Sequence, residues 1–366
     1  METADRILED LRELVTHESP SDDPARVSAL AAWIRDRLNG GGPPIARTVP
    51  CPGRGDAVIA EVGDGSAPST LLLGHIDTVW PVGTLAEIPF SLTDGVVRGP
   101  GVFDMKAGAA VAMQVLDRLR ARAAAPRVTL LLVPDEEVGS AASHDLLIAT
   151  AKRHDRVLVL EPSAPGGAAK VARKGTGQFR VVFKGIPSHA GLDPEKGASA
   201  LTALSEFVLA APTFANAAAG TTVTPTLAAA GSKANVVPEF AETTLDCRVW
   251  APEEPARVEA ALRAWRPSDA RVQVEIEGAF DRPPLAETDA SRALFAKAHA
   301  IAADLGFDLR GERVGGASDG NLTAAAGVPT LDGLGPQGDG AHARHEHVLA
   351  SDLARRLELI ERLTLA

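Results

Sequence analysis

Residues Leu71–Thr78, with the sequence LLLGHIDT, decide how the rest of the chain is interpreted. A short, unbroken apolar run that ends at a glycine is typical of a buried strand in a parallel sheet. His75 and Asp77 follow directly, and on an extended chain their side chains point the same way. The histidine is therefore either a structural residue or a metal ligand whose second ring nitrogen a nearby carboxylate orients.

Outward from this stretch, other apolar runs also have the character of buried strands. Helical composition separates them at Met105–Arg122, where Asp104 occupies the expected N-cap position, and at Ala141–Arg153. Strands that alternate with helices predict an α/β domain with a mixed, mostly parallel sheet and helices on both faces. The further strands are predicted at Ala57–Val62, Val128–Val133, Val157–Leu160 and Val328–Leu331.

The segment from about Gly175 to Gly278 has a different pattern. Its order is β-α-β-β-α-β, which is the ferredoxin-like arrangement. We therefore expect one domain over residues 1–174 and 285–366 and a second, inserted domain over residues 175–284. The predicted elements of the second domain are strands at 177–185, 222–229, 241–249 and 271–277 and helices at 198–211 and 253–265.

Charge and composition exclude several classes of protein. The formal net charge is −11 and no basic stripe is present, which disfavours nucleic-acid binding. Met1–Val15 lacks the basic stretch and apolar core of a signal peptide, and no run of about 18 apolar residues would span a membrane. Cys51 and Cys247 lie far apart and form no metal-binding pair, which suits a reducing compartment. We expect a cytoplasmic protein.

Acidic side chains stand at other places where strands and helices meet. Asp104 lies between a glycine-rich turn and a helix start, and by itself this position favours a capping role. Asp135, Glu136 and Glu137 follow the strand predicted at Val128–Val133. Adjacent carboxylates raise one another's pKa unless a cation neutralises them, so this is either a solvated acidic loop or a metal site with a neighbouring free base.

Two further stretches fit the same scheme. Glu161 follows the strand at Val157–Leu160, and the histidine-rich stretch GDGAHARHEHV contains His342. His75, Glu137 and Glu161 would then all lie just beyond the carboxyl ends of parallel strands, which is where ligands bind in open α/β sheets. Five nitrogen and oxygen ligands without cysteine suit two divalent ions that share a carboxylate.

At these residues the chain resembles the M20 metallopeptidases of the glutamate carboxypeptidase type. The matching stretches occur in family order and span nearly the whole chain: GHIDTVWPVG, GPGVFDMKAG, PDEEVGS, LEPS, GIPSHAG and GAH.

The resemblance implies a role for each residue of the cluster. His75 and Glu161 would bind one metal ion, Glu137 and His342 would bind the other, and Asp104 would bridge them. Glu136 matches the family's general base, and Asp77 matches the carboxylate that orients His75. Zinc is the expected metal, with cobalt or manganese able to substitute. His345 and His347 are expected outside the ligand set.

The resemblance also assigns roles to the inserted domain. Residues 175–284 match a lid that commonly mediates homodimerisation, and His189 matches a histidine that stabilises the oxyanion in the partner subunit's site. Other residues match positions that bind substrate: Asn235 and Arg248 for its carboxylate, with Lys170 and Arg282 as weaker candidates, and Gly315, Gly316 and Ser318 in a glycine-rich loop.

The implied enzyme is a two-metal hydrolase that cleaves the amide bond of a C-terminal glutamate-like residue in a small N-acyl amino acid or peptide. Two alternatives stay open. The first is an N-acyl-amino-acid deacylase or dipeptidase of the same family. The second is a noncatalytic metal-binding protein on the same fold, against which the presence of Glu136 beside Glu137 argues.

Overall fold

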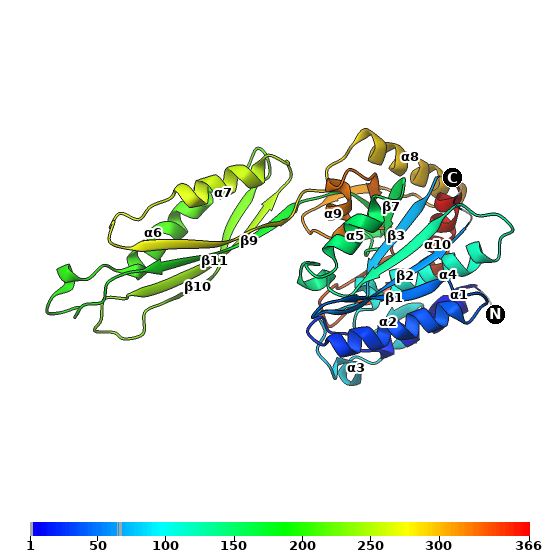
Figure 1. Cartoon of the computed structure of the whole chain (residues 1–366), viewed down its shortest axis with the longest axis horizontal. Helices are drawn as coiled ribbons and strands as arrows, with labels where there is room; N and C mark the ends of the chain where they lie inside the picture. The colour runs from blue at the N-terminus through cyan, green and yellow to red at the C-terminus, as the bar shows by residue number, and fades with distance from the viewer. Residues whose placement is uncertain (1–2, 64, 66–67) are drawn as a thin grey trace. The chain divides into compact units, whose positions relative to one another are not determined.

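The computed structural model describes residues 3–63, 65 and 68–366 of the chain (Figure 1). These residues form two compact units, and each is described by itself. The first unit comprises Met1–Ala172, Glu287–Val314 and Ser318–Ala366, and the second comprises Arg173–Ala286 and Gly315–Ala317. In the described part of the chain, no helix combines the length and apolar character that crossing a membrane requires.

A six-stranded sheet forms the centre of the first unit. Its strands, in spatial order, are β1 (Ala46–Cys51), β2 (Gly55–Val62), β6 (Val128–Val133), β3 (Thr70–His75), β7 (Arg156–Val159) and β14 (Thr330–Leu331). The strands from β6 to β14 run parallel, whereas β1 and β2 are antiparallel to their neighbours. The predicted mixed, mostly parallel sheet is confirmed.

Alternate side chains of the central strands enter two separate cores. Leu72 of β3 and Leu130 of β6 pack against one set of helices, while Leu71 and Leu131 face the opposite core. This follows from the two-residue period of a strand, so strands buried on both faces are apolar at most positions. The helices of the first face are α1 (Thr3–Thr16), α2 (Pro24–Asn39), α4 (Ala107–Arg120), α8 (Asp289–Asp304) and α10 (Ala350–Leu365), and those of the second are α5 (His144–Ala151) and α9 (Asp319–Ala325).

Smaller elements complete the first unit. A four-stranded antiparallel sheet contains, in spatial order, β15 (Gly338–Asp339), β16 (His347–Leu349), β5 (Val96–Arg98) and β4 (Ser91–Thr93). The remaining elements are β8 (Ala169–Arg173), which pairs with β13 (Gly311–Val314), and the single helical turn α3 (Thr84–Glu87). Because β5 pairs with β16, the turn that follows Arg98 lies next to the loop that precedes His347.

One local prediction is wrong. The helix expected from Met105, with Asp104 as its N-cap, begins at Ala107 and has Lys106 at the N-cap position. Residues Val102–Lys106 instead form a wide π-type turn, in which Asp104 and Met105 have non-helical backbone angles and are joined by a cis peptide bond. The carboxylate of Asp104 lies beside the side chains of His75 and His342 instead of capping the helix.

The second unit has the predicted β-α-β-β-α-β order, which confirms the ferredoxin-like arrangement. Its elements are β9 (Gly175–Lys184), α6 (Ala200–Ala210), β10 (Thr222–Ala230), β11 (Phe240–Val249), α7 (Glu254–Ala264) and β12 (Gln273–Arg282), with the strands in the spatial order β10-β11-β9-β12. Both helices cover the same face of the sheet, where Phe179, Phe183 and Phe207 form the centre of a separate core (Figure 1). The opposite face carries ion pairs from Arg180 to Glu242 and Glu277.

Candidate metal centre

Three polar side chains come from the carboxyl ends of adjacent parallel strands. His75 is the last residue of β3, Glu161 lies two residues after β7, and Glu137 lies in a turn of 3-10 helix, Glu136–Val138, that follows β6. The order β6-β3-β7 places these ends side by side. Packing at this edge is close, because a Cβ atom on Gly74 would lie 2.5 Å from the terminal methyl group of Met105, and one on Gly108 would lie 2.1 Å from the carbonyl oxygen of Leu160.

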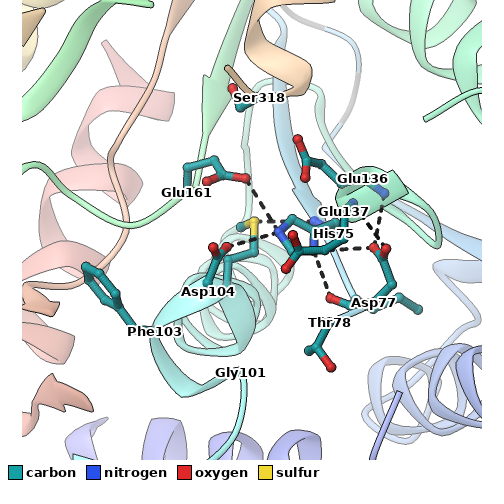
Figure 2. A network of polar contacts seen from close by, with 12 residues as sticks. His75, Asp77, Thr78, Gly101, Phe103, Asp104, Glu136, Glu137, Glu161 and Ser318 are labelled. Carbon is teal, nitrogen blue, oxygen red and sulfur yellow. Dashed lines mark hydrogen bonds and ion pairs between the residues drawn. The ribbon is translucent and has the colours of Figure 1, made fainter. Parts of the chain in front are cut away.

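Asp104 stands between two imidazole rings. Its Oδ1 atom is 3.2 Å from Nε2 of His75, and its Oδ2 atom is 3.3 Å from Nε2 of His342. The same nitrogen of His75 lies 3.5 Å from Oε1 of Glu161, and the same nitrogen of His342 lies 3.1 Å from Oε2 of Glu137. Figure 2 shows Asp104 and Glu161 on one side of the His75 ring and Asp77 on the other.

Asp77 connects His75 to the acidic turn. Nδ1 of His75 lies 2.9 Å from the backbone oxygen of Asp77 and 3.4 Å from its Oδ1 atom. The fully buried carboxylate of Asp77 also accepts hydrogen bonds from the backbone N–H groups of Glu136 and Glu137 and from the hydroxyl of Ser21. Asp77 therefore orients one ring nitrogen and holds the backbone that carries both glutamates.

The protonation of the cluster reflects its crowded charges. The pKa of His342 is raised to about 10, because Asp104 and Glu137 stabilise its protonated ring. Burial alone would lower the pKa of His75, but hydrogen bonds to Asp104 and Asp77 outweigh it and raise this pKa. Burial likewise opposes ionisation of Asp104, yet the two histidines hold its pKa below the usual range. His342 also has a φ of 61°, a left-handed conformation uncommon outside glycine.

The carboxylates and imidazoles of this cluster are suitable ligands for divalent cations. The Oε1 atom of Glu137 is buried and has no hydrogen-bond partner within the described part of the chain. Carboxylates and imidazoles suit zinc and related ions, and a cation would compensate both the unpaired oxygen and the mutual repulsion of the acids. Potential ligand atoms lie within 4.8 Å of one another in two sets, His75–Asp104–Glu137 and His75–Glu136–Glu161. Glu136 and Glu137 therefore each belong to one set that could hold a cation.

The third acid of the predicted run has a different environment. Asp135 is completely buried and accepts hydrogen bonds from the hydroxyl and N–H of Ser143 and from the N–H of Ala142. Ser140 donates a further hydrogen bond to Asp319 at the start of α9. These contacts fix the turn on the side away from its two glutamates, so Asp135 contributes to structure at this site.

Sequence reasoning did not identify Glu346 or Trp80. The buried carboxylate of Glu346 accepts hydrogen bonds from the indole N–H of Trp80 and from the backbone N–H groups of Gly101, Phe103 and Asp104. The only sequence signal was an acidic residue between His345 and His347, and these two drew attention as possible ligands. His345 is exposed, and the ring of His347 lies 3.0 Å from the backbone oxygen of His345.

Several of the predicted substrate-binding residues belong to the second unit. His189 is exposed, and its Nδ1 atom accepts the backbone N–H groups of Gly191 and Leu192. Asn235 lies beside it in the chain fold, since its carbonyl oxygen accepts the N–H of Ala190. Arg248, on β11, binds the carboxylate of Asp246 and directs Nη1 toward the carbonyl oxygen of Gly315 at 3.5 Å.

The other candidates have structural partners. Arg282 is buried at the end of β12, and the carbonyl oxygen of Gly316 accepts a hydrogen bond from Arg173. In the first unit, the backbone of Lys170 pairs with Asp332. Ser318 is completely buried, caps helix α9 and donates its hydroxyl to Asp332 at 2.5 Å. The predicted substrate role of Ser318 thus falls on a residue whose hydroxyl is already engaged.

An α/β unit with imidazoles and carboxylates gathered at the carboxyl edge of its parallel strands defines a metal-dependent hydrolase. The chain belongs to peptidase family M20/M25/M40, whose family model matches residues 71–366. This finding confirms the resemblance seen in the motifs. The protein is an M20 metallopeptidase, a hydrolase of carboxypeptidase-like type.

Three known proteins illustrate the similarity. Carboxypeptidase G2 from Pseudomonas sp. (strain RS-16) is 30% identical, and the alignment covers 98% of this chain and 88% of that protein. Succinyl-diaminopimelate desuccinylase from Alkalilimnicola ehrlichii is 32% identical over 78% of this chain and 80% of its own length. The crystal structure of a Bacillus subtilis protein described as a dinuclear metal binding peptidase from the M20 family has a TM-score of 0.66, with 18% identity over 99% of this chain and 97% of that one.

The raised pKa values predict that metal binding releases protons. At pH 7 both His75 and His342 are protonated in the metal-free protein, because the folded-state pKa of each is raised and that of His342 is about 10. A metal binds only the neutral ring, so saturation with Zn²⁺ should release about two protons from these rings. Calorimetry in buffers of different ionisation enthalpy measures this number.

Two variants serve as controls. His342→Ala should release about one proton fewer than the wild type, whereas the exposed His345→Ala should release the same number. The number for the wild type should fall as the pH rises through 10, where the free ring of His342 loses its proton unaided. An unchanged proton count in His342→Ala would contradict the assignment.

Proposed function

We propose that the protein is a two-metal amidohydrolase that removes a glutamate-like C-terminal residue from a small N-acyl amino acid or peptide. The observation that carries this proposal is the position of Asp104 between Nε2 of His75 and Nε2 of His342. Each histidine has its own additional carboxylate, Glu161 or Glu137. A shared carboxylate between two similar ligand pairs is the arrangement expected for two cations.

The ligand assignment follows from these pairs. His75 and Glu161 would hold one cation, His342 and Glu137 would hold the other, and Asp104 would contact both. Two divalent cations in this place would acidify a water molecule and polarise the amide carbonyl. We propose zinc for both sites, with cobalt or manganese able to substitute, because nitrogen and oxygen donors without sulfur suit all three ions.

Glu136 is the proposed general base. Its backbone is fixed by Asp77, as is that of Glu137, so one acid can bind a cation while its neighbour stays available. Glu136 would accept a proton from the attacking water and return it to the leaving amine.

Residues of the second unit would recognise the substrate. Because Nδ1 of His189 accepts two backbone N–H groups, its neutral ring carries a proton on Nε2 and can donate it to an oxyanion. Arg248 and Asn235 would bind the substrate carboxylate. Asp246 holds Nε and Nη2 of the guanidinium, which orients the group before substrate arrives. Lys170 and Arg282 are weaker candidates for the same carboxylate, and Gly315, Gly316 and Ser318 are proposed to form a glycine-rich substrate loop.

A second candidate function is removal of an acyl group from another amino acid. The 32% identity to succinyl-diaminopimelate desuccinylase supports it, since that enzyme's name describes the release of a succinyl group. Both candidates use the same cluster, and they differ in what the substrate presents on either side of the amide. A substrate series therefore distinguishes them.

We also propose that two copies pair through the second unit. Strand β10 is an edge of its sheet, and its residues Thr226–Ala230 have the uncharged sequence TLAAA and are exposed. Natural edge strands usually carry charges that prevent pairing, as Glu275 and Glu277 do on the other edge strand, β12. The exposed Leu227 of β10 and Leu209 of α6 suit a two-fold contact in which one surface meets itself.

The first prediction from this proposal concerns substrate preference. A hydrogen bond to a charged group contributes about 1.5–3 kcal/mol. The kcat/KM for N-acyl-glutamate should therefore exceed that for N-acyl-leucine about 10–100-fold in the zinc-loaded enzyme, because only glutamate carries a second carboxylate. Arg248→Met should lower kcat/KM for both substrates, because both carry the C-terminal carboxylate that Arg248 is proposed to bind. Amine release from N-acyl-glutamate, N-acyl-leucine and N-succinyl amino acids measures it. Preference for the succinyl group irrespective of the amino acid would favour the deacylase instead.

The second prediction separates the two adjacent glutamates by the same isosteric change. Glu136→Gln should retain both metal ions and lose about 10²–10⁴ in kcat, because an amide cannot accept the proton of water. Glu137→Gln should lose metal ions on dialysis, since it removes a charged ligand. Metal content by atomic emission and kcat are measured on both variants. Loss of metal from Glu136→Gln alone would reverse the two roles.

The third prediction concerns the homodimer. Leu209→Glu combined with Leu227→Lys should convert the dimer to monomer, because these changes place charge in the proposed contact. Light scattering measures the mass. The matched control is Leu92→Lys, which charges an exposed leucine of the first unit and should leave the dimer intact. A monomeric wild-type protein at working concentration would refute the proposal.

Complementation tests whether His189 acts across that dimer. His189→Ala should retain metal but lose about 10²–10³ in kcat, as does removal of other oxyanion donors. When it is mixed with Glu136→Gln under conditions that exchange subunits, each mixed dimer should contain one site with both residues intact. Demonstrated exchange without recovered activity would place the action of His189 within its own chain.

A further inference from the structure

Glu346 has an unusual hydrogen-bond environment for a buried acid. Only 1% of its surface is exposed. Its Oε1 atom accepts the backbone N–H groups of Phe103 at 2.8 Å and Asp104 at 3.0 Å, and its Oε2 atom accepts the N–H of Gly101 at 2.9 Å and the indole N–H of Trp80 at 2.7 Å. All four donors are neutral, and the buried side chain of Lys106 adds an attractive electrostatic interaction with this carboxylate.

These donors belong to the chain segments that carry proposed metal ligands. Phe103 and Asp104 lie in the wide turn Val102–Lys106, which carries the Asp104 carboxylate, and Gly101 directly precedes this turn. Trp80 lies on the loop that follows His75, five residues downstream. Glu346 itself lies four residues after His342, and the pairing of β16 with β5 brings these stretches together. One carboxylate therefore joins the segments of His75, Asp104 and His342.

The turn around Asp104 depends on such a tie. Val102–Lys106 lacks regular helical geometry at Asp104 and Met105, and no regular helix uses the N–H groups of Phe103 and Asp104 or that of the preceding Gly101. Buried N–H groups without acceptors are unfavourable. Glu346 supplies the acceptors, and because one of its bonds is to the N–H of Asp104, it restrains the residue proposed to contact both cations.

We propose that Glu346 is a positioning residue of the metal centre, which sets the orientation of Asp104 and thereby the affinity of both cations. This inference rests on the proposed two-metal site. Glu346 contacts neither cation, and it acts by holding the backbone from which Asp104 reaches His75 and His342. Partners of this kind behind metal ligands affect metal affinity about 10–100-fold when they are removed.

The test compares Co²⁺ binding by metal-free wild-type protein with that by Glu346→Gln. The amide is isosteric, but its NH₂ group faces N–H donors and cannot accept from them. We expect Glu346→Gln to fold, to bind Co²⁺ about 10–100-fold more weakly, and to change the visible absorption of the bound ion, because the carboxylate of Asp104 takes a different orientation. Circular dichroism reports the fold, and competition with a chelator gives the affinity.

The matched control is Glu361→Gln in helix α10. Glu361 is also a buried acid, 7% exposed, and its hydrogen bonds to Arg118 and Arg122 at 2.8 and 2.9 Å make no contact with the cluster. Its loss should lower Tm and leave Co²⁺ affinity and absorption unchanged. If Glu361→Gln weakened Co²⁺ as much as Glu346→Gln, general destabilisation would explain both, and the positioning role would be wrong.

Two milder variants decide the matter if Glu346→Gln does not fold. Trp80→Phe removes one of the four donors, and Glu346→Asp keeps the charge but shortens the side chain. Both should weaken Co²⁺ binding and alter its absorption, to a smaller extent than the amide. Wild-type affinity and absorption in the folded variants would overturn the positioning role alone. Absence of Co²⁺ binding by the wild type would overturn the proposed metal centre and this inference with it.

Discussion

Repulsion between carboxylates is the constraint around which the first unit is organised. Asp104, Glu137 and Glu161 converge on two imidazole rings at a largely buried sheet edge, where like charges interact more strongly than in water. Without a cation, the neighbouring carboxylates raise the pKa values of both histidines, which therefore bind protons more readily. A fold that gathers these groups is therefore most stable when positive charge is supplied, either by protons or by divalent ions.

Two further acids hold the cluster through backbone contacts. Asp77 and Glu346 are buried and accept N–H groups, Asp77 from the turn of Glu136 and Glu137 and Glu346 from the turn of Asp104. Carboxylates bind N–H groups more strongly than neutral acceptors do. Irregular turns can thus be held rigidly at the ends of strands, where ligand-bearing side chains need defined directions.

The second unit follows a different physical plan. Its aromatic core lies under two helices on one face of an antiparallel sheet, and ion pairs cover the opposite face. Its core is apolar, and its loops carry residues proposed for substrate recognition. The turn that holds Nδ1 of His189 and the carboxylate that holds Arg248 are both local to this unit.

The sequence alone determined the class of fold and most of the side chains that gather at the edge of the parallel strands. Short apolar runs such as Val128–Val133 have the length of a buried strand and are too short for a helix. Acids or histidines directly after such strands are expected at the carboxyl edge of the sheet. The turn at Asp104 was mispredicted as a helix cap, since local propensity cannot reveal a carboxylate 242 residues away that accepts its N–H. Glu346, Trp80 and Ser21 likewise gained their roles only in the tertiary structure, because hydrogen bonds between distant segments follow from packing and leave no periodic signal in the chain.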